Sequence, residues 1–170
     1  LDLAKKYFPR VHCTLGVHPH DAKSYTVEGE TFMRAHFNDP EVVGVGEIGL
    51  DYYYENSDRE VQRKVFERQL AMAVEYNLPV EIHTRDAEED TDAILRNFNG
   101  KIRGVLHCFT GTQWLADRAL ELGLNLSFSG IVTFKNAVEL RKVVVATPLE
   151  RLHVETDAPF LAPVPMRGKK

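Results

Sequence analysis

The chain has 170 residues, of which 44% are hydrophobic and 27% are charged; this composition is that of a soluble globular protein, and we expect one domain over residues 1–170. It carries 21 Lys and Arg against 25 Asp and Glu, and the net charge of −4 excludes a general attraction to nucleic acid or to an anionic membrane, so any binding of phosphate must be local. No apolar stretch reaches the roughly 20 residues that cross a bilayer, so we expect no membrane association. The two cysteines have neither the CxxC spacing of a zinc site nor the density of a secreted disulfide scaffold. This predicts reduced thiols and a cytoplasmic location.

Strands and helices alternate along the chain. Residues 1–6, which begin without Met, are typical of the end of a helix, and we expect further residues before them. Six apolar runs predict strands at residues 11–17, 42–47, 79–83, 104–107, 124–128 and 152–156. Helices are predicted at residues 58–76, 87–98, 113–122 and 137–146. The first of these helices should begin with a capping box formed by Ser57 and Glu60.

Four of the predicted strands lead into a residue that can bind a metal ion. These residues are Glu47, His83, His107 and Asp157. A doubly wound open sheet concentrates its site at one switch point, whereas ligands from four strand ends converge on the ring of a barrel. We therefore predict an α/β fold of the (β/α)₈ TIM-barrel type. Such a barrel has eight strands and about 250 residues, so we expect the N-terminal strands and the last helix to be missing from this chain.

Five motifs follow one another in the sequence. They are GVHPHD at residues 16–21, GEIGLDY at 46–52, HTRDA at 83–87, HCFTG at 107–111 and ETDAPFL at 155–161. In this order they resemble the signatures of the TatD family, metal-dependent deoxyribonucleases with a TIM-barrel fold in the amidohydrolase-like group. The resemblance extends over nearly the whole chain.

The resemblance implies a role for each matching residue. Glu47 matches a carboxylate that bridges two divalent ions, and His83 and His107 match the imidazoles that hold one of them. Asp157 matches the aspartate that binds the other ion and orients or deprotonates the attacking water. The ions, two per complete site, would polarise a phosphoryl oxygen and supply hydroxide near neutral pH. Mg²⁺, Mn²⁺ and Zn²⁺ all suit these ligands.

The chain departs from the family at the first strand. In the family this strand supplies an HxH pair to the second ion, and no HxH motif stands in that position here. His18 and His20 have the same spacing but follow the third strand in the family's order.

Substrate binding requires cations near the metal ions. We predict that Arg85 and Arg167 bind phosphates, because guanidinium groups bind phosphate in a bidentate manner, and Lys135 is the third candidate. His18 resembles a family histidine that could face the scissile phosphate. The backbone N–H groups at residues 110–112, which open a helix, could hold an anion.

Other polar and aromatic residues near the motifs have structural interpretations. Glu155 could support the site through an ion pair or bind a metal ion, and we expect Glu81 to point into the barrel beside a Lys or Arg. His20 and Asp51 are predicted to fix turns. Tyr52, Tyr53 and Tyr54 could stack on a nucleobase or pack within their loop, and the sequence leaves both open.

Three functions are compatible with the sequence. The first, implied by the resemblance, is metal-dependent hydrolysis of DNA phosphodiester bonds by activated water, from a single-stranded end. The second is an amidohydrolase-like enzyme for a small ester, lactone or amide. The third is an inactive, truncated barrel that serves as an interaction domain. The cations favour the first function, and the absent HxH strand favours the third.

Overall fold

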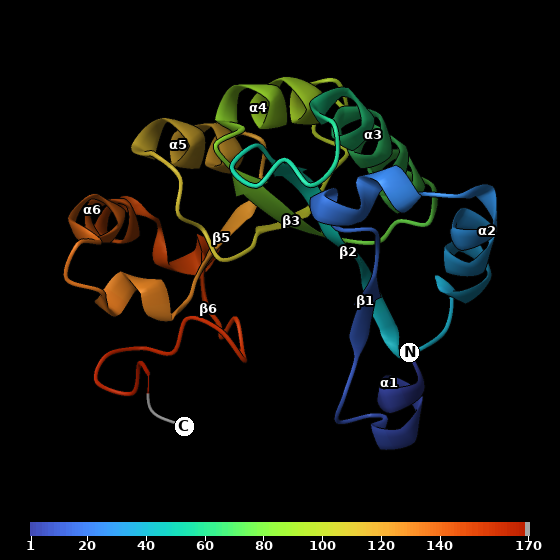
Figure 1. Cartoon of the computed structure of the whole chain (residues 1–170), viewed down its shortest axis with the longest axis horizontal. Helices are drawn as coiled ribbons and strands as arrows, with labels where there is room; N and C mark the ends of the chain where they lie inside the picture. The colour runs from blue at the N-terminus through green and yellow to red at the C-terminus, as the bar shows by residue number, and fades with distance from the viewer. Residues whose placement is uncertain (169–170) are drawn as a thin grey trace.

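The computed structural model of the chain describes residues 1–168 (Figure 1). Lys169 and Lys170, the basic end of the segment that contains Arg167, lie outside the described residues. The elements are α1 (Asp2–Tyr7), β1 (Cys13–Leu15), η1 (Pro19–Ser24), α2 (Val27–His36), β2 (Val42–Asp51), α3 (Arg59–Glu75), β3 (Val80–Arg85), α4 (Glu88–Arg96), β4 (Gly104–Leu106), α5 (Gln113–Glu121), β5 (Asn125–Phe128), η2 (Gly130–Thr133), α6 (Val138–Ala146), η3 (Leu149–Arg151) and β6 (Leu152–Val154).

The strands of residues 1–168 form one parallel sheet in sequence order, from β1 to β6. In Figure 1 they lie along an arc, with helices along its outer side. A doubly wound sheet would change direction at a switch point, whereas sequential order is that of a (β/α) barrel. The prediction of a barrel with about six of its eight strands is therefore confirmed, and the ring is open between β1 and β6.

The core lies between the sheet and the helices that pack on it, and helix α3 contributes several of its buried side chains. Ile48, Leu50 and Ile82 from the strands are completely buried, as are Phe66 and Leu70 from α3. Removing such side chains from water is the main force that stabilises a fold of this kind.

The predicted cap of α3 was wrong by one residue. Asp58 is the N-cap, and its carboxylate accepts hydrogen bonds from the N–H groups of Glu60 and Val61. Ser57 is buried instead, and its hydroxyl donates to the carbonyl oxygen of His20. The next residue is an equally good cap, so Ser57 is free to tie the start of α3 to η1.

Strand β2 is longer than the sequence predicted, because it continues past Glu47 to Asp51. The pairing shifts between Val45 and Ile48, so that Gly46 and Glu47 lie opposite the single residue between Val80 and Ile82. A bulge of this kind re-aims a side chain. It places Glu47 on the face of the sheet where His83 emerges.

The helix α2 was not predicted. Thr26 caps it by accepting a hydrogen bond from the N–H of Gly29, but Met33 is its one buried residue, so the apolar periodicity is weak. An ion-pair network holds α2 against α3. Glu30 accepts hydrogen bonds from Arg34 (2.7 Å) and Arg68 (2.9 Å).

This ion-pair network should make the stability of the chain depend on pH. The hydrogen bond from Arg68 is the largest cause that lowers the pKa of Glu30 from 4.5 to about 2, and burial opposes it. A depressed carboxyl pKa stabilises the fold above its unfolded value, and the contribution is lost as pH falls from 4.5 toward 2. Glu30→Gln should therefore lower the melting temperature at neutral pH, with a difference that narrows over this range. Glu67→Gln, an exposed change on α3, should show no such trend, and a difference independent of pH would contradict the assignment.

Candidate metal centre

A cavity of about 750 Å³ opens at the carboxyl ends of the strands. It brings together Glu47, His83, His107, Asp157, His18 and Arg85, all of which the sequence predicted for the site. Lys135 and Arg167 do not line it. Active sites of (β/α) barrels lie at this end of the strands. A second cavity, of about 490 Å³ around Gly44 and Gly104, is not lined by such a cluster of possible metal ligands.

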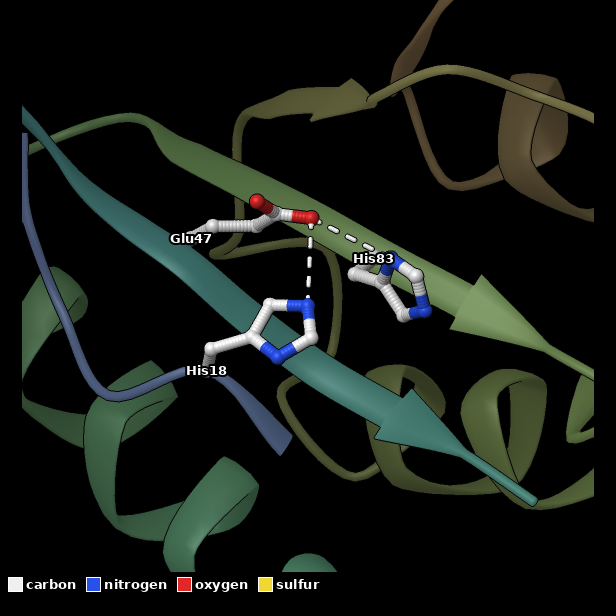
Figure 2. Close-up of side chains that lie close together, drawn as sticks. All are labelled: His18, Glu47 and His83. Atoms are coloured by element: carbon white, nitrogen blue, oxygen red, sulfur yellow. Dashed lines mark hydrogen bonds and ion pairs between the residues drawn. The ribbon is translucent and has the colours of Figure 1, made fainter. Parts of the chain in front are cut away.

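Glu47 lies at the centre of the possible metal ligands. In residues 1–168, the tight group of ligand atoms comes from His18, Glu47 and His83, which lie within 4.8 Å of one another. Figure 2 shows both rings facing the carboxylate of Glu47. Nδ1 of His83 is 3.1 Å from its Oε1, and Nε2 of His107 is 4.0 Å from the same oxygen.

The outer nitrogen of each predicted ligand histidine is bound by a carboxylate. Nε2 of His83 lies 3.0 Å from Oδ2 of Asp51, and Nδ1 of His107 lies 2.7 Å from Oε2 of Glu155. A carboxylate only accepts, so each ring donates there, and its other nitrogen, which faces Glu47, can bind a cation once it gives up its proton. Histidines that ligate metal ions have this arrangement. The donor set therefore fits a divalent cation, and the expected support role of Glu155 matches its contact.

The charges of the centre are coupled. Burial raises the pKa of Glu47, but the hydrogen bonds to His18 and His83 outweigh it and hold that pKa far below its usual range. For His107, burial lowers the pKa, yet the hydrogen bond and charge of Glu155 raise it to about 9. Protonated His107 therefore supplies a positive charge among several carboxylates, which is the charge that a bound cation would replace.

His18 differs from the other two histidines. It caps η1, where its Nδ1 accepts a hydrogen bond from the N–H of His20 at 3.2 Å. A neutral ring that accepts at Nδ1 carries its proton on Nε2, and this atom lies 3.6 Å from Oε1 of Glu47. His18 is thus arranged to donate a hydrogen bond into the cavity, in keeping with the predicted contact to substrate.

Asp157 and Glu81 also lie beside the ring of His107, Asp157 near Nε2 and Glu81 near Nδ1. Oδ1 of Asp157 lies 3.6 Å from Nε2 of His107. The expected Lys or Arg partner of Glu81 was wrong, because its carboxylate accepts a hydrogen bond from the hydroxyl of Thr14 (3.0 Å) and lies 3.4 Å from Nδ1 of His107. An imidazolium and a hydroxyl satisfy this carboxylate in place of a long cationic side chain.

Asp51 was missed as a site residue. The sequence predicted that it fixes a turn, and its Oδ1 does accept from the N–H groups of Tyr53 and Tyr54. Its Oδ2, however, accepts from both His83 and His20, the latter at 2.9 Å. The carboxyl group is 0% exposed, and these bonds lower its pKa against the opposing effect of burial. His20 thus binds Asp51 through its ring, which a turn alone would not require.

Two buried glutamines on α3 hold the backbone beside the site. The amide of Gln69 accepts from the N–H of Val17 and donates to its carbonyl oxygen, at 2.6 and 3.0 Å. Gln62 makes the same pair of bonds to Asp51, at 2.8 and 3.0 Å. The two glutamines lie two turns apart on one face of α3. They fix the backbone of Val17, the residue before His18, and of Asp51 at the end of β2. Sequence reasoning missed them because they interrupt an otherwise apolar face.

Comparisons with known proteins identify the family. The model of the family described as TatD related DNase matches residues 1–170. The chain belongs to the TatD family. It is 42% identical over 161 residues to the uncharacterized metal-dependent hydrolase YabD of Bacillus subtilis, covering 94% of this chain and 63% of that protein.

Two further comparisons agree with this membership. The chain is 40% identical over 158 residues to a 3′-5′ ssDNA/RNA exonuclease TatD of Pantoea vagans, covering 92% of this chain and 61% of that protein. The crystal structure of YJJV, a TatD homolog from Escherichia coli K12, matches with a TM-score of 0.89 at 32% identity, covering 98% of this chain and 65% of that one. The chain thus spans less than two thirds of the length of these relatives.

The predicted phosphate-binding cations of this TatD-family chain lie in two places. Arg85, at the end of β3, lines the cavity. Arg167 lies with its Cζ 4.0 Å from the centre of the Phe134 ring, and Lys135 is exposed next to that phenylalanine. The start of α5, predicted to hold an anion, binds a carboxylate of the chain itself, because Glu88 accepts from the N–H and the hydroxyl of Thr112.

None of the helices in residues 1–168 has the length and hydropathy of a membrane-spanning segment.

Replacing Asp51 should weaken metal binding without unfolding the TatD-family chain. In Asp51→Asn the amide oxygen can still accept from the turn, but the NH₂ group would face the two imidazole N–H groups as a second donor. We expect the affinity for Mn²⁺ or Zn²⁺ to fall by about 10-fold to 100-fold, as for other residues that orient metal ligands. Isothermal titration calorimetry measures this affinity. Asp58→Asn, the same change at a helix cap, is the control, and equal affinities in both variants would refute the role.

Proposed function

We propose that the chain is the catalytic part of a divalent-metal-dependent hydrolase that cleaves phosphodiester bonds of DNA from a single-stranded end. The observation that carries the proposal is the arrangement of His83 and His107. Each ring is held by a carboxylate on its outer nitrogen and turns its inner nitrogen toward Glu47. The metal-dependent hydrolase and exonuclease names of its relatives support it.

Glu47, His83 and His107 would hold one divalent ion. Such an ion acts as a Lewis acid toward a phosphoryl oxygen and makes hydroxide available near neutral pH. Asp157, at the edge of the same cavity, would accept the proton of the attacking water. His18 would donate a hydrogen bond to a phosphate oxygen.

Arg85 would bind a phosphate next to the scissile one. Among the described residues it has no carboxylate partner within ion-pair distance, unlike Arg34, Arg63 and Arg96. An arginine without a carboxylate, in the wall of a cavity rich in carboxylates, is suited to an anionic substrate. The small-molecule alternative gives this cation no such role.

Arg85 provides the test of the DNA substrate. In the wild-type chain, single-stranded DNA should bind in the presence of divalent metal. Arg85→Ala should weaken binding and reduce the slope of log affinity against log salt by about 0.7, the contribution of one phosphate contact to a single strand. Arg118→Ala, which removes an arginine outside the cavity, should leave the slope unchanged.

Activity separates the DNA substrate from the small-molecule alternative. A chimera, in which the part of the Bacillus subtilis relative that this chain does not match completes the chain, should degrade single-stranded DNA with divalent metal and stop with EDTA. Cleavage of lactones or esters with DNA left intact would favour the small-molecule enzyme. A chimera that binds no metal and shows no activity would favour the third function, an interaction domain.

A further inference from the structure

The turn after β2 presents two tyrosines beside the metal centre. Tyr53 is 57% exposed and Tyr54 is 54% exposed, and Tyr54 lines the cavity. Their N–H groups donate to Oδ1 of Asp51, at 3.0 and 2.9 Å. Because the other oxygen of the same buried carboxylate binds His83, the backbone of both tyrosines is fixed relative to the predicted ligands.

Tyr52 shows what packing within this loop looks like. Its hydroxyl donates to Asp90 at 2.6 Å, and the guanidinium of Arg59 covers its ring at 4.5 Å. Tyr53 and Tyr54 form no side-chain hydrogen bond among the described residues, and more than half of each is exposed to solvent. Loop packing therefore accounts for Tyr52, whereas Tyr53 and Tyr54 contact each other and Arg85 and still remain more than half exposed.

Arg85 joins the two exposed rings to the cavity. It pairs with Asp51 in the sheet, and its Cζ lies 3.9 Å from the centre of the Tyr53 ring and 4.8 Å from that of Tyr54. A guanidinium stacked on an aromatic ring keeps its N–H groups free at the edge. Tyr54 also packs edge-on against His20 at 5.3 Å. An aromatic surface and a phosphate-binding cation thus adjoin the ligands.

We propose that Tyr53, Tyr54 and Arg85 form a stacking site for an unpaired nucleobase whose phosphate lies near the metal centre. The inference rests on the proposed function and names the feature of the substrate that the site selects. A ring face stacks on any base, while a base within a duplex has both faces covered by its neighbours. The site would therefore favour single-stranded ends over duplex DNA through the bases, in addition to the phosphates.

The test compares two oligonucleotides of the same length and charge, one with bases and one with an abasic backbone. Their binding to the chain is measured by fluorescence anisotropy with divalent metal present. The wild type should bind the base-containing strand about 10-fold more tightly, as expected for one stacked base. Tyr53→Leu and Tyr54→Leu together should abolish that preference while the abasic strand binds as before.

Two variants control for indirect effects. Tyr54→Phe retains the ring and should retain the preference. Trp114→Leu removes an exposed aromatic ring that lies beside Arg118 outside the cavity, and should also retain it. Equal binding of both strands by the wild type, or an equal loss for both in the tyrosine variants, would overturn the stacking site alone. Failure of both strands to bind would instead reject DNA as the substrate, and the stacking site with it.

Discussion

The double variant His83→Ala, His107→Ala is expected to lose bound divalent metal completely after dialysis, whereas the wild-type chain keeps it. Both imidazoles point their inner nitrogens toward Glu47, so the variant removes the two predicted nitrogen ligands of the ion and leaves Glu47 with His18, whose Nε2 lies 3.6 Å away. Two ligands do not hold Zn²⁺ or Mn²⁺ against dialysis, because affinity depends on the number of ligands. Elemental analysis of the dialysed protein gives the metal content directly.

The matched control removes two histidines outside the cavity, His12 and His36. This variant should keep the metal content of the wild type. Circular dichroism establishes that each variant is folded. Equal metal content in the wild type and the His83, His107 variant would show that these residues do not form the site.

The second large effect is expected from Asp157→Asn. The amide keeps the size of the side chain but cannot accept a proton, so turnover in the chimera should fall by about 10²-fold or more while the fold survives. The aspartate lies 3.6 Å from His107, but it is not a ligand of the ion proposed to be held by Glu47, His83 and His107, so this ion should remain. Single-turnover cleavage of DNA and metal analysis measure the two properties separately.

Asp117→Asn, on the outer helix α5, is the control for this substitution. It should leave turnover unchanged. Wild-type turnover in Asp157→Asn would remove the aspartate from the reaction, and loss of all metal would make it a ligand of the retained ion instead.

The sequence predicted the order of the sheet because buried parallel strands are continuous apolar runs, and the residues at their ends are polar for a reason other than packing. Glu47, His83, His107 and Asp157 were predicted in this way, and all four line the cavity, although β2 continues past Glu47. Helix α2 was missed, since an element that buries little beyond Met33 leaves almost no periodic signal.

The supporting residues were harder to predict because their partners are distant in the chain. Asp51 is near His83 only through the pairing of β2 with β3, and Gln69 reaches Val17 across 52 positions. The bulge at Glu47 depends on the same pairing, and a single strand contains no sign of it. Local patterns therefore indicated the candidate ligands, while the bonds that orient their side chains became visible only in the tertiary structure.

The most direct test of the metal centre is anomalous X-ray scattering from crystals of the chain grown with Mn²⁺. We expect an anomalous peak bonded to Oε1 of Glu47, Nδ1 of His83 and Nε2 of His107, with the outer nitrogens of the two rings still on Asp51 and Glu155. No peak in the cavity, or a peak that does not contact Glu47, would contradict the assignment.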